Sequence, residues 1–222
     1  MKIKDAAKLA AEILTKEGPA GCVRLTRSYF NLTNEPIVMS TMPLMIQIEP
    51  TLHCNLECSM CVNPLMRRQK RHMSFKDFQK IIDDVPSLKK ISLVGAGEGL
   101  LNPDLFDMIA YAKSRSISIG FATNAMLLDD SMCKRIIDSR VDWVNISVDS
   151  AEKDKYERIR KGASFSRLLE NIERLVSAKG RKMAPDISIW FVIMKDNLNE
   201  LSDVIALAGT LGIPKVSAQL EH

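Results

Sequence analysis

No apolar run in this 222-residue chain approaches the roughly 20 consecutive residues that a membrane-spanning helix needs. The first residues, Met1 to Asp5, lack the apolar stretch of a secretory signal peptide. The chain also has no internal repeat and no low-complexity segment. We therefore expect a cytoplasmic globular protein that does not associate with a membrane, with one main core and room for an N-terminal attachment.

The cysteine content does not suit a disulfide framework. The chain has five cysteines, an odd number, and Cys54, Cys58 and Cys61 fall within eight residues. Such crowding is typical of a metal site in a reducing compartment. Of the remaining two, Cys133 lies between apolar residues of an expected helix, so we predict that it is part of the core.

The chain has no strong excess of charge. Its formal net charge of +4 favours no particular class of partner, and it does not favour nucleic acid. The one concentrated patch comprises Arg67, Arg68, Lys70 and Arg71. This basic stretch could bind a phosphate or an acidic substrate, or it could be a solvated loop.

From Pro43 onward, short runs rich in β-branched residues alternate with longer segments of helical period. This alternation predicts βα units and a parallel sheet. The expected helices include Phe165 to Ala178, ending at Gly180, and Leu198 to Leu211, ending at Gly212. Both open sheets and barrels of this kind place functional residues at the carboxyl ends of the strands. The six expected strands are Leu44 to Ile48, Lys90 to Val94, Ser118 to Ala122, Trp143 to Val148, Ser188 to Ile193 and Lys215 to Ala218.

Local capping signals predict two further helix starts. Ser74 with Asp77 resembles a capping box, and Asn102 before Pro103 predicts a cap with proline at the first helical position.

The segments outside the alternating region are assigned separately. In residues 1–42 we expect a helix from Ile3 to Lys16, stopped by Gly18 and Pro19, and then an irregular or extended stretch to Thr41. Residues 43–219 form the expected core. Residues 220–222 resemble the start of a vector-encoded tag and are left out of functional reasoning.

The cysteine triplet follows closely after the first expected strand. Cys54, Cys58 and Cys61 are spaced four and three residues apart, so one loop carries all three thiols. Three thiolates can bind three irons of a cubane cluster and leave the fourth iron without a protein ligand. The rival is a structural zinc site, with His53 or a distant residue as the fourth ligand.

The triplet and its setting resemble the radical S-adenosylmethionine superfamily, whose signature is C-x-x-x-C-x-x-C after the first strand of a partial (β/α)6 barrel. The resemblance runs from about Leu44 to Ala218. The flanks, Ile48 to Thr51 and Asn63-Pro64, are similar to the branch with a cysteine-rich C-terminal extension, called SPASM or twitch. The implied fold is α/β, a partial TIM-like barrel with an N-terminal helical and extended segment.

The resemblance also implies the chemistry. Cys54, Cys58 and Cys61 would hold a [4Fe-4S] cluster that reductively cleaves S-adenosylmethionine to a 5′-deoxyadenosyl radical. That radical would abstract hydrogen from a peptide, a cofactor precursor or another small molecule. The implied partner is a low-potential electron donor of the flavodoxin or ferredoxin type. No side chain is expected to act as a catalytic group.

Several residues match motifs that bind S-adenosylmethionine in the family. Ala96, Gly97 and Glu98 correspond to the Gly-Gly-Glu motif that binds the methionyl amino group, with Ala96 in place of the usual glycine. Glycines at this position would let the backbone approach a ligand closely. Met60 stands where the family usually has an aromatic residue against the adenine.

Further matches lie at later strand ends. The pairs Thr123-Asn124 and Ser147 with Asp149 resemble residues that bind ribose hydroxyls and the methionyl carboxylate, and Arg160 is the candidate for a two-pronged contact with that carboxylate. Asn197 and Glu200 could approach the nucleoside, but their spacing also suits a helix-capping pair.

Two other functional classes remain open from the sequence. The chain could be a non-catalytic metal-binding module that holds zinc or a degenerate iron-sulfur cluster. It could also be a radical enzyme that acts on RNA, which only the basic stretch suggests.

We predict that replacing any one of Cys54, Cys58 or Cys61 by alanine removes most of the bound iron, because two thiolates cannot hold a cubane. Iron and sulfide analysis after anaerobic reconstitution measures this loss. Cys22→Ala and Cys133→Ala are the controls and should keep the wild-type iron content. Loss of the cluster in Cys133→Ala would contradict the ligand assignment.

Overall fold

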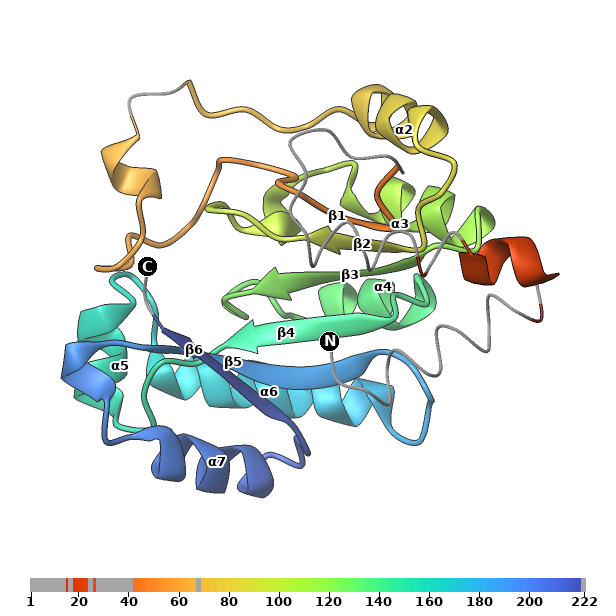
Figure 1. The fold of residues 1–222 in the computed structure, drawn as a ribbon. Helices are drawn as coiled ribbons and strands as arrows, with labels where there is room; N and C mark the ends of the chain where they lie inside the picture. Colours follow the sequence, from red (N-terminus) through yellow and green to blue (C-terminus); the bar gives the residue numbers. More distant parts are fainter. Residues whose placement is uncertain (1–14, 16–17, 24–25, 27–41, 67–68, 221–222) are drawn as a thin grey trace.

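A single parallel sheet with helices along one face forms the fold (Figure 1). The structure is a computed structural model, and it describes residues 15, 18–23, 26, 42–66 and 69–220. Within these residues, no helix is both long and apolar enough to cross a membrane.

The sheet has six strands in the order β1-β2-β3-β4-β5-β6, and every neighbouring pair is parallel. Each strand pairs with the next one along the chain, and no pairing between β6 and β1 closes the described sheet. The sheet is therefore an open partial barrel, as expected. Its strands are β1 (Met45–Ile48), β2 (Lys90–Leu93), β3 (Ser118–Thr123), β4 (Trp143–Ser147), β5 (Asp186–Ile193) and β6 (Val216–Leu220).

Helices fill the connections between successive strands, which keeps every strand pointing the same way. The connection from β4 to β5 contains two α-helices, and the other four contain one each among the described residues. The α-helices are α2 (Phe75–Asp84), α3 (Leu105–Ser114), α4 (Asp130–Asp138), α5 (Lys153–Ile159), α6 (Phe165–Lys179) and α7 (Leu201–Thr210). Short 3₁₀ helices are η1 (Asn63–Leu65), η2 (Gly99–Leu101) and η3 (Lys195–Asn197).

The core lies between the sheet and its helices. Alternate residues of the central strands, such as Phe121 of β3, Ile146 of β4 and Phe191 of β5, are fully buried there. Side chains at the intervening positions point to the other face of the sheet, which is concave in a partial barrel. That face is more polar, and Ser92, Asn145, Ser188, Trp143 and Trp190 line a cavity of about 760 Å³ on it.

The sequence predicted the elements more accurately than their ends. All six strands are present, and the helix expected from Phe165 runs to Lys179. Ser74 caps α2 as predicted, accepting a hydrogen bond from the Asp77 N–H at 3.1 Å. β6 extends through Leu220, two residues beyond the strand that the sequence predicted and into the segment resembling a tag.

The predicted start of α3 at Pro103 is wrong, because the helix begins at Leu105. The N-cap of the helix is Asp104, and the Asn102 side-chain oxygen accepts from the Asp104 N–H at 2.9 Å. The Asn102 amide group also donates to the carbonyls of Pro50 and Met73, at 2.7 and 3.0 Å. One side chain thus forms a local bond through its oxygen and long-range bonds through its nitrogen.

The N-terminal segment departs from the expectation where the structure describes it. Residues 18–23 are helical, although an irregular or extended stretch was expected after Gly18. Pro19 does not prevent this, since proline fits the first turn of a helix. The Thr26 hydroxyl donates to the Cys22 carbonyl at 3.0 Å, a spacing of four residues. The helix expected from Ile3 lies almost wholly outside the described residues.

One close packing contact on the concave face depends on glycine. Gly120 of β3 is paired with Trp143 of β4, and the indole ring lies against the Gly120 backbone. A Cβ atom at position 120 would be 2.2 Å from Cδ2 and 2.3 Å from Cε2 of that ring. Any side chain there would therefore displace Trp143.

We predict that Gly120→Ala destabilises the protein by about 1–3 kcal/mol, the usual cost of overpacking. Gly209→Ala is the matched control, because a Cβ at that position of α7 would meet no atom within 4 Å. It should stabilise the protein by about 0.5–1 kcal/mol, since alanine favours a helix more than glycine does. Urea unfolding measures both free energies. Equal effects of the two substitutions would contradict the packing analysis.

Candidate functional site: a cysteine loop at the carboxyl edge of the sheet

The three clustered cysteines lie in the loop that follows β1, at the edge toward which all six strands point (Figure 1). Each sulfur has a hydrogen-bond donor beside it. The N–H of Leu56 lies 3.4 Å from Cys54 Sγ, and the N–H of Asn63 lies 3.4 Å from Cys61 Sγ. A guanidinium nitrogen of Arg160 lies 3.9 Å from Cys58 Sγ. Donors placed in this way stabilise thiolates that bind a metal centre.

The chain after α5 holds one side of the cysteine loop. The N–H of Glu57 donates to the Lys161 carbonyl at 3.0 Å, and the N–H of Ser59 donates to the Ile159 carbonyl at 2.8 Å. Cys58 therefore lies between two backbone hydrogen bonds to a segment about 100 residues away in sequence. These bonds place Cys58 beside Arg160, the residue between the two acceptors.

The loop after β2 contacts the other side of the cysteine loop. The N–H of Glu98 donates to the His53 carbonyl at 2.8 Å. A Cβ atom at Gly97 would lie 2.1 Å from the Thr51 carbonyl oxygen and 2.8 Å from that of His53. The glycine is thus required by the backbone that leads into the cysteine loop, whereas the sequence suggested that it makes room for a ligand.

Two anchoring residues were missed by the sequence analysis. The Glu49 carboxylate accepts a hydrogen bond from the Ala96 N–H. Asn63, which is buried, donates from its side chain to the carbonyls of Leu52 and Ala96, at 2.9 and 2.8 Å. Both residues lie in the flanking segments that carry part of the family resemblance, although neither side chain was assigned a role there. Their effect is to tie the loops after β1 and β2 into one unit.

Arg160 forms a buried ion pair with Asp149, whose carboxylate lies 2.6 Å away. Asp149 is fully buried and also accepts a hydrogen bond from the Val192 N–H at 2.9 Å. Burial alone would lower the pKa of Arg160, but the charges of Asp149 and Cys58 raise it, so the guanidinium stays protonated. A permanent positive charge therefore lies beside the cysteine loop.

Burial raises the pKa of both Cys54 and Cys58 in the metal-free chain. Arg160 opposes this increase at both thiols, but burial outweighs it. The two thiols are therefore protonated at neutral pH until a metal displaces their protons. Burial likewise raises the pKa of Cys133, to about 11, and Cys133 is part of the core as predicted.

The candidate residues after β2 and β3 lie at the same edge of the sheet as the cysteine loop. Their side chains form hydrogen bonds with other groups of the protein. Glu98 is buried and accepts from the N–H groups of Asn124 and Leu100, at 2.7 and 3.3 Å. Burial raises its pKa, although these hydrogen bonds oppose the shift. Asn124 donates to the Asn55 side chain at 2.9 Å, and Thr123 accepts from the Ala125 N–H at 3.0 Å.

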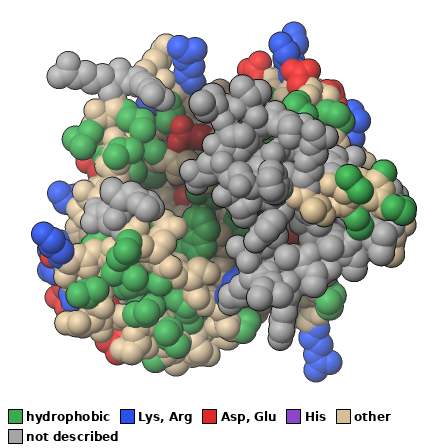
Figure 2. Space-filling model, viewed as in Figure 1, with side chains coloured by type: hydrophobic (Ala, Val, Ile, Leu, Met, Phe, Trp, Pro, Cys, Tyr) green, Lys and Arg blue, Asp and Glu red, His purple; other side chains and the backbone are tan. Residues whose placement is uncertain are grey.

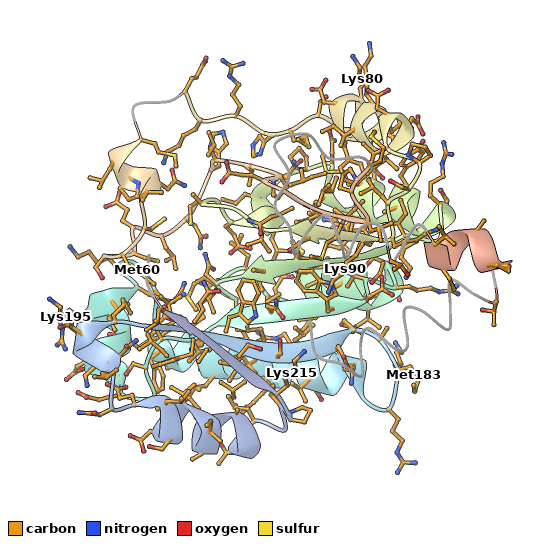
Figure 3. The ribbon with its side chains drawn as sticks, in the orientation of Figure 1. Met60, Lys80, Lys90, Met183, Lys195 and Lys215 are labelled. Carbon is orange, nitrogen blue, oxygen red and sulfur yellow. The ribbon has the colours of Figure 1, made fainter. Side chains whose placement is uncertain are left out.

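The side chains of two other candidates, Ser147 and Met60, make no hydrogen bond to the described residues. Ser147 is half-buried at the end of β4 and has no side-chain hydrogen bond to the described residues. Met60 is half-buried at the end of the molecule toward which the strands point (Figure 3). The Ala96 carbonyl lies 3.8 Å from Cys61 Sγ. Met60 belongs to the cysteine loop and the Ala96 carbonyl lies beside it, whereas Ser147 ends β4 at the same edge of the sheet.

The interpretation of Asn197 and Glu200 as a capping pair is wrong. Glu200 precedes α7 but makes no side-chain capping bond. Its carboxylate instead binds Lys155 and Ser150. Asn197 is buried and donates to the carbonyls of Asp149 and Val192, at 2.9 and 2.8 Å. Both side chains connect the loops after β4 and β5.

The arrangement of ligands bears on which metal the loop could hold. Among the residues that the structure describes, no three His, Cys, Asp or Glu side chains converge as ligands of a single ion must. A cubane does not require such convergence, because each thiolate binds a different iron. The ring of His53, the residue considered as a fourth zinc ligand, stacks on His72 with centroids 4.3 Å apart.

The basic stretch is only partly described, since Arg67 and Arg68 lie outside the described residues. Lys70 and Arg71 are exposed, and the Arg71 carbonyl accepts from the Leu52 N–H at 3.0 Å. On the face in Figure 2, the described Lys and Arg side chains lie around the outline of the molecule and do not gather in one patch.

We predict that Gly97→Ala lowers the iron content of the reconstituted protein several-fold, because its Cβ would displace the backbone of Thr51 and His53. The matched control is Gly99→Ala, whose Cβ would be 3.7 Å from the nearest atom, an ordinary contact. It should bind iron as the wild type does. Iron and sulfide analysis distinguishes the two. If Gly97→Ala kept its iron and lost only affinity for S-adenosylmethionine, the glycine would serve the ligand and this account would be wrong.

Comparisons with known proteins place this site in a family. Residues 48–208 match the family model of the Radical SAM superfamily. The mycofactocin maturase MftC of Mycobacterium ulcerans is 28% identical over 171 residues, covering 77% of this chain and 45% of that protein. The tungsten-containing aldehyde ferredoxin oxidoreductase cofactor-modifying protein of Pyrococcus furiosus is 30% identical over 173 residues, covering 76% and 49%. The chain thus spans about half the length of these relatives.

Solved structures agree on the fold. The crystal structure of Streptococcus suis SuiB bound to S-adenosylmethionine matches with a TM-score of 0.70 and 17% identity, over 93% of this chain and 47% of SuiB. The crystal structure of SuiB bound to the precursor peptide SuiA matches with a TM-score of 0.68. The partial barrel and the family resemblance are both confirmed, and the chain belongs to the radical SAM superfamily.

Proposed function

We propose that this chain is the S-adenosylmethionine-cleaving core of a radical enzyme that modifies a peptide. The observation that supports it best is the donor arrangement around the three sulfurs, one donor beside each of Cys54, Cys58 and Cys61. These thiols share one loop and a buried positive charge. That combination fits a cubane held by three thiolates.

The bound cluster would supply the electron that cleaves S-adenosylmethionine into methionine and a 5′-deoxyadenosyl radical. The chain's own residues would bind and orient the reactants. Arg160 would offset the negative charge of the thiolates, since its charge is fixed by the ion pair with Asp149. The Ala96 carbonyl would accept from the methionyl amino group, which its position 3.8 Å from Cys61 Sγ supports.

The roles proposed for the other candidate residues divide into two groups. Ser147 and Met60 have no competing hydrogen bond among the described residues, and we propose that they contact the nucleoside directly. Glu98, Asn124 and Asp149 bind protein groups, so we propose that they act mainly by positioning the loops around the cofactor. Gly97 and Thr123 would act in the same way, through backbone packing and a turn.

Support for a peptide substrate comes from two relatives. One matched structure contains a bound precursor peptide, and another relative is named a PqqA peptide cyclase, 26% identical over 178 residues. A low-potential flavodoxin or ferredoxin is the proposed electron donor.

Two assays test this function in sequence. The anaerobically reconstituted protein is first incubated with S-adenosylmethionine and dithionite, and 5′-deoxyadenosine is measured by mass spectrometry. We predict formation by the wild type and only background in Cys58→Ala, with Cys133→Ala as the matched control. A preparation that binds zinc without sulfide and forms no 5′-deoxyadenosine would contradict the proposal and favour the metal-binding module.

The second assay identifies the substrate class. Deuterated synthetic peptides, taken from short reading frames beside the gene, are added to the same reaction. We expect deuterium in 5′-deoxyadenosine when the correct peptide is present. Transfer from a deuterated RNA oligonucleotide, with none from any peptide, would replace the peptide assignment with RNA.

A further inference from the structure

Asn145 of β4 differs from the other buried asparagines in the described part of the chain. Its side-chain oxygen accepts a hydrogen bond from the Ser188 hydroxyl at 2.6 Å, but its amide nitrogen has no acceptor among the described residues. Asn145 is only 8% exposed, and buried polar groups are almost always paired. The amide nitrogen donates to a protein oxygen in each of the others, which are Asn63, Asn102, Asn124, Asn171 and Asn197.

The position of Asn145 on the sheet leaves space beside this amide. Asn145 lies on the concave face, as do Trp143 and Ser147, because side chains two residues apart on a strand share a face. Its neighbours on the adjacent strands, Ala122 of β3 and Ser188 of β5, are both small. Asn145 and Ser188 line the cavity of about 760 Å³, and the amide nitrogen is not one of the unpaired atoms sealed from solvent. The unpaired donor therefore borders space that a ligand can enter.

The cavity extends along the concave face to the residues that end β4. Lys90 and Lys215 line it where β2 and β6 start, on the side away from Met60 (Figure 3). Trp190 lines it further along β5 and pairs in register with Ser147, the proposed nucleoside contact. Asn145 precedes Ser147 by two residues, which is about 7 Å along a strand. A molecule bound at Asn145 would thus lie next to the nucleoside.

The chemistry around Asn145 favours an uncharged acceptor. Ser188 donates to the side-chain oxygen of Asn145, so the nitrogen with its two hydrogens is left for a ligand. A phosphate or a carboxylate would require a cation beside it. The charged residues among the described lining all lie at the start of a strand or directly before it, and they are Lys90, Asp142, Asp186 and Lys215. A peptide carbonyl oxygen is an uncharged acceptor and fits this position.

We propose that Asn145 donates a hydrogen bond from its amide group to a backbone carbonyl oxygen of the peptide substrate, and so places the reacting residue beside the nucleoside. Ser188 is a positioning residue that acts by orienting Asn145. This inference rests on the proposed function, since it requires a peptide substrate.

The test compares Asn145→Asp with Gln79→Glu, each of which exchanges an amide NH₂ group for an oxygen. Gln79 of α2 is the matched control, because α2 does not line the cavity. The probe is the deuterated synthetic peptide that transfers deuterium to 5′-deoxyadenosine in the wild type. We expect the KM for this peptide to rise about tenfold in Asn145→Asp, because the carbonyl oxygen would face a carboxylate. Gln79→Glu should keep the wild-type KM.

The role of Ser188 has its own measurement. Ser188→Ala leaves the amide group of Asn145 free to turn, so it should raise the KM for the peptide more than it lowers kcat. A fall in kcat at unchanged KM would contradict the orienting role. An unchanged KM in Asn145→Asp would overturn the whole inference.

A double variant separates substrate binding from a structural role and covers the case in which Asn145→Asp fails to fold. Asn145→Leu combined with Ser188→Ala replaces the polar pair by apolar groups and removes the donor that lacks an acceptor. Such a replacement should leave the melting temperature of the metal-free protein unchanged or higher, and it should raise the KM for the peptide. A lower melting temperature or an unchanged KM would overturn the inference.

The wild type distinguishes this inference from the proposed function. A wild-type protein that forms no 5′-deoxyadenosine, or that takes deuterium from RNA and from no peptide, would refute the proposed function itself. Deuterium transfer from a peptide, with the wild-type KM in the Asn145 variants, would refute only the role of Asn145.

Discussion

The site depends on the close contact between two backbones, that of Gly97 after β2 and that of Thr51 to His53 after β1. A Cβ at Gly97 would lie 2.1 Å from the Thr51 carbonyl oxygen, so only glycine allows the two segments to meet. The adjacent hydrogen bond from Glu98 to His53 then fixes their register. The cysteine loop, which begins directly after these residues, is positioned by this contact and by the parallel strands that bring both loops to one edge.

A second constraint is electrostatic. Arg160 and Asp149 are both buried, and neither charge would be tolerable alone. Removing either partner would leave an unpaired charge in the interior, which is the costly outcome, whereas the intact pair supplies little net stability. The pair matters for where it lies, because Asp149 holds the positively charged Arg160 side chain beside Cys58. The loop thereby carries a built-in counter-charge for thiolates.

Polar residues near strand ends were the hardest to interpret from the sequence. Glu200 stands where a helix cap is expected, yet its carboxylate binds Ser150 and Ala151, which are far away in the sequence. A local capping bond and a long-range bond satisfy the same carboxylate about equally well, so the choice depends on which donor the fold brings near. Asn102 forms both kinds of bond, because its oxygen accepts from the nearby Asp104 N–H while its amide group donates to Pro50 and Met73. Ser74 caps α2 as predicted because its nearest partner, Asp77, is local.

The sequence alone determined the order of elements, the parallel sheet, the presence of Cys54, Cys58 and Cys61 in one loop, and the family. The elements and the cysteine loop follow from periodicity and spacing, which are local properties of the chain, and the family follows from the resemblance of its motifs to those of known proteins. Only the tertiary structure decided what each neighbouring residue does. Gly97 is required by the cysteine loop itself, and Arg160 binds Asp149 and lies beside Cys58. Apart from the ion pair of Arg160 with Asp149, such roles depend on contacts between segments far apart in the chain, as between Arg160 and Cys58, and a sequence does not state which of its polar groups will meet.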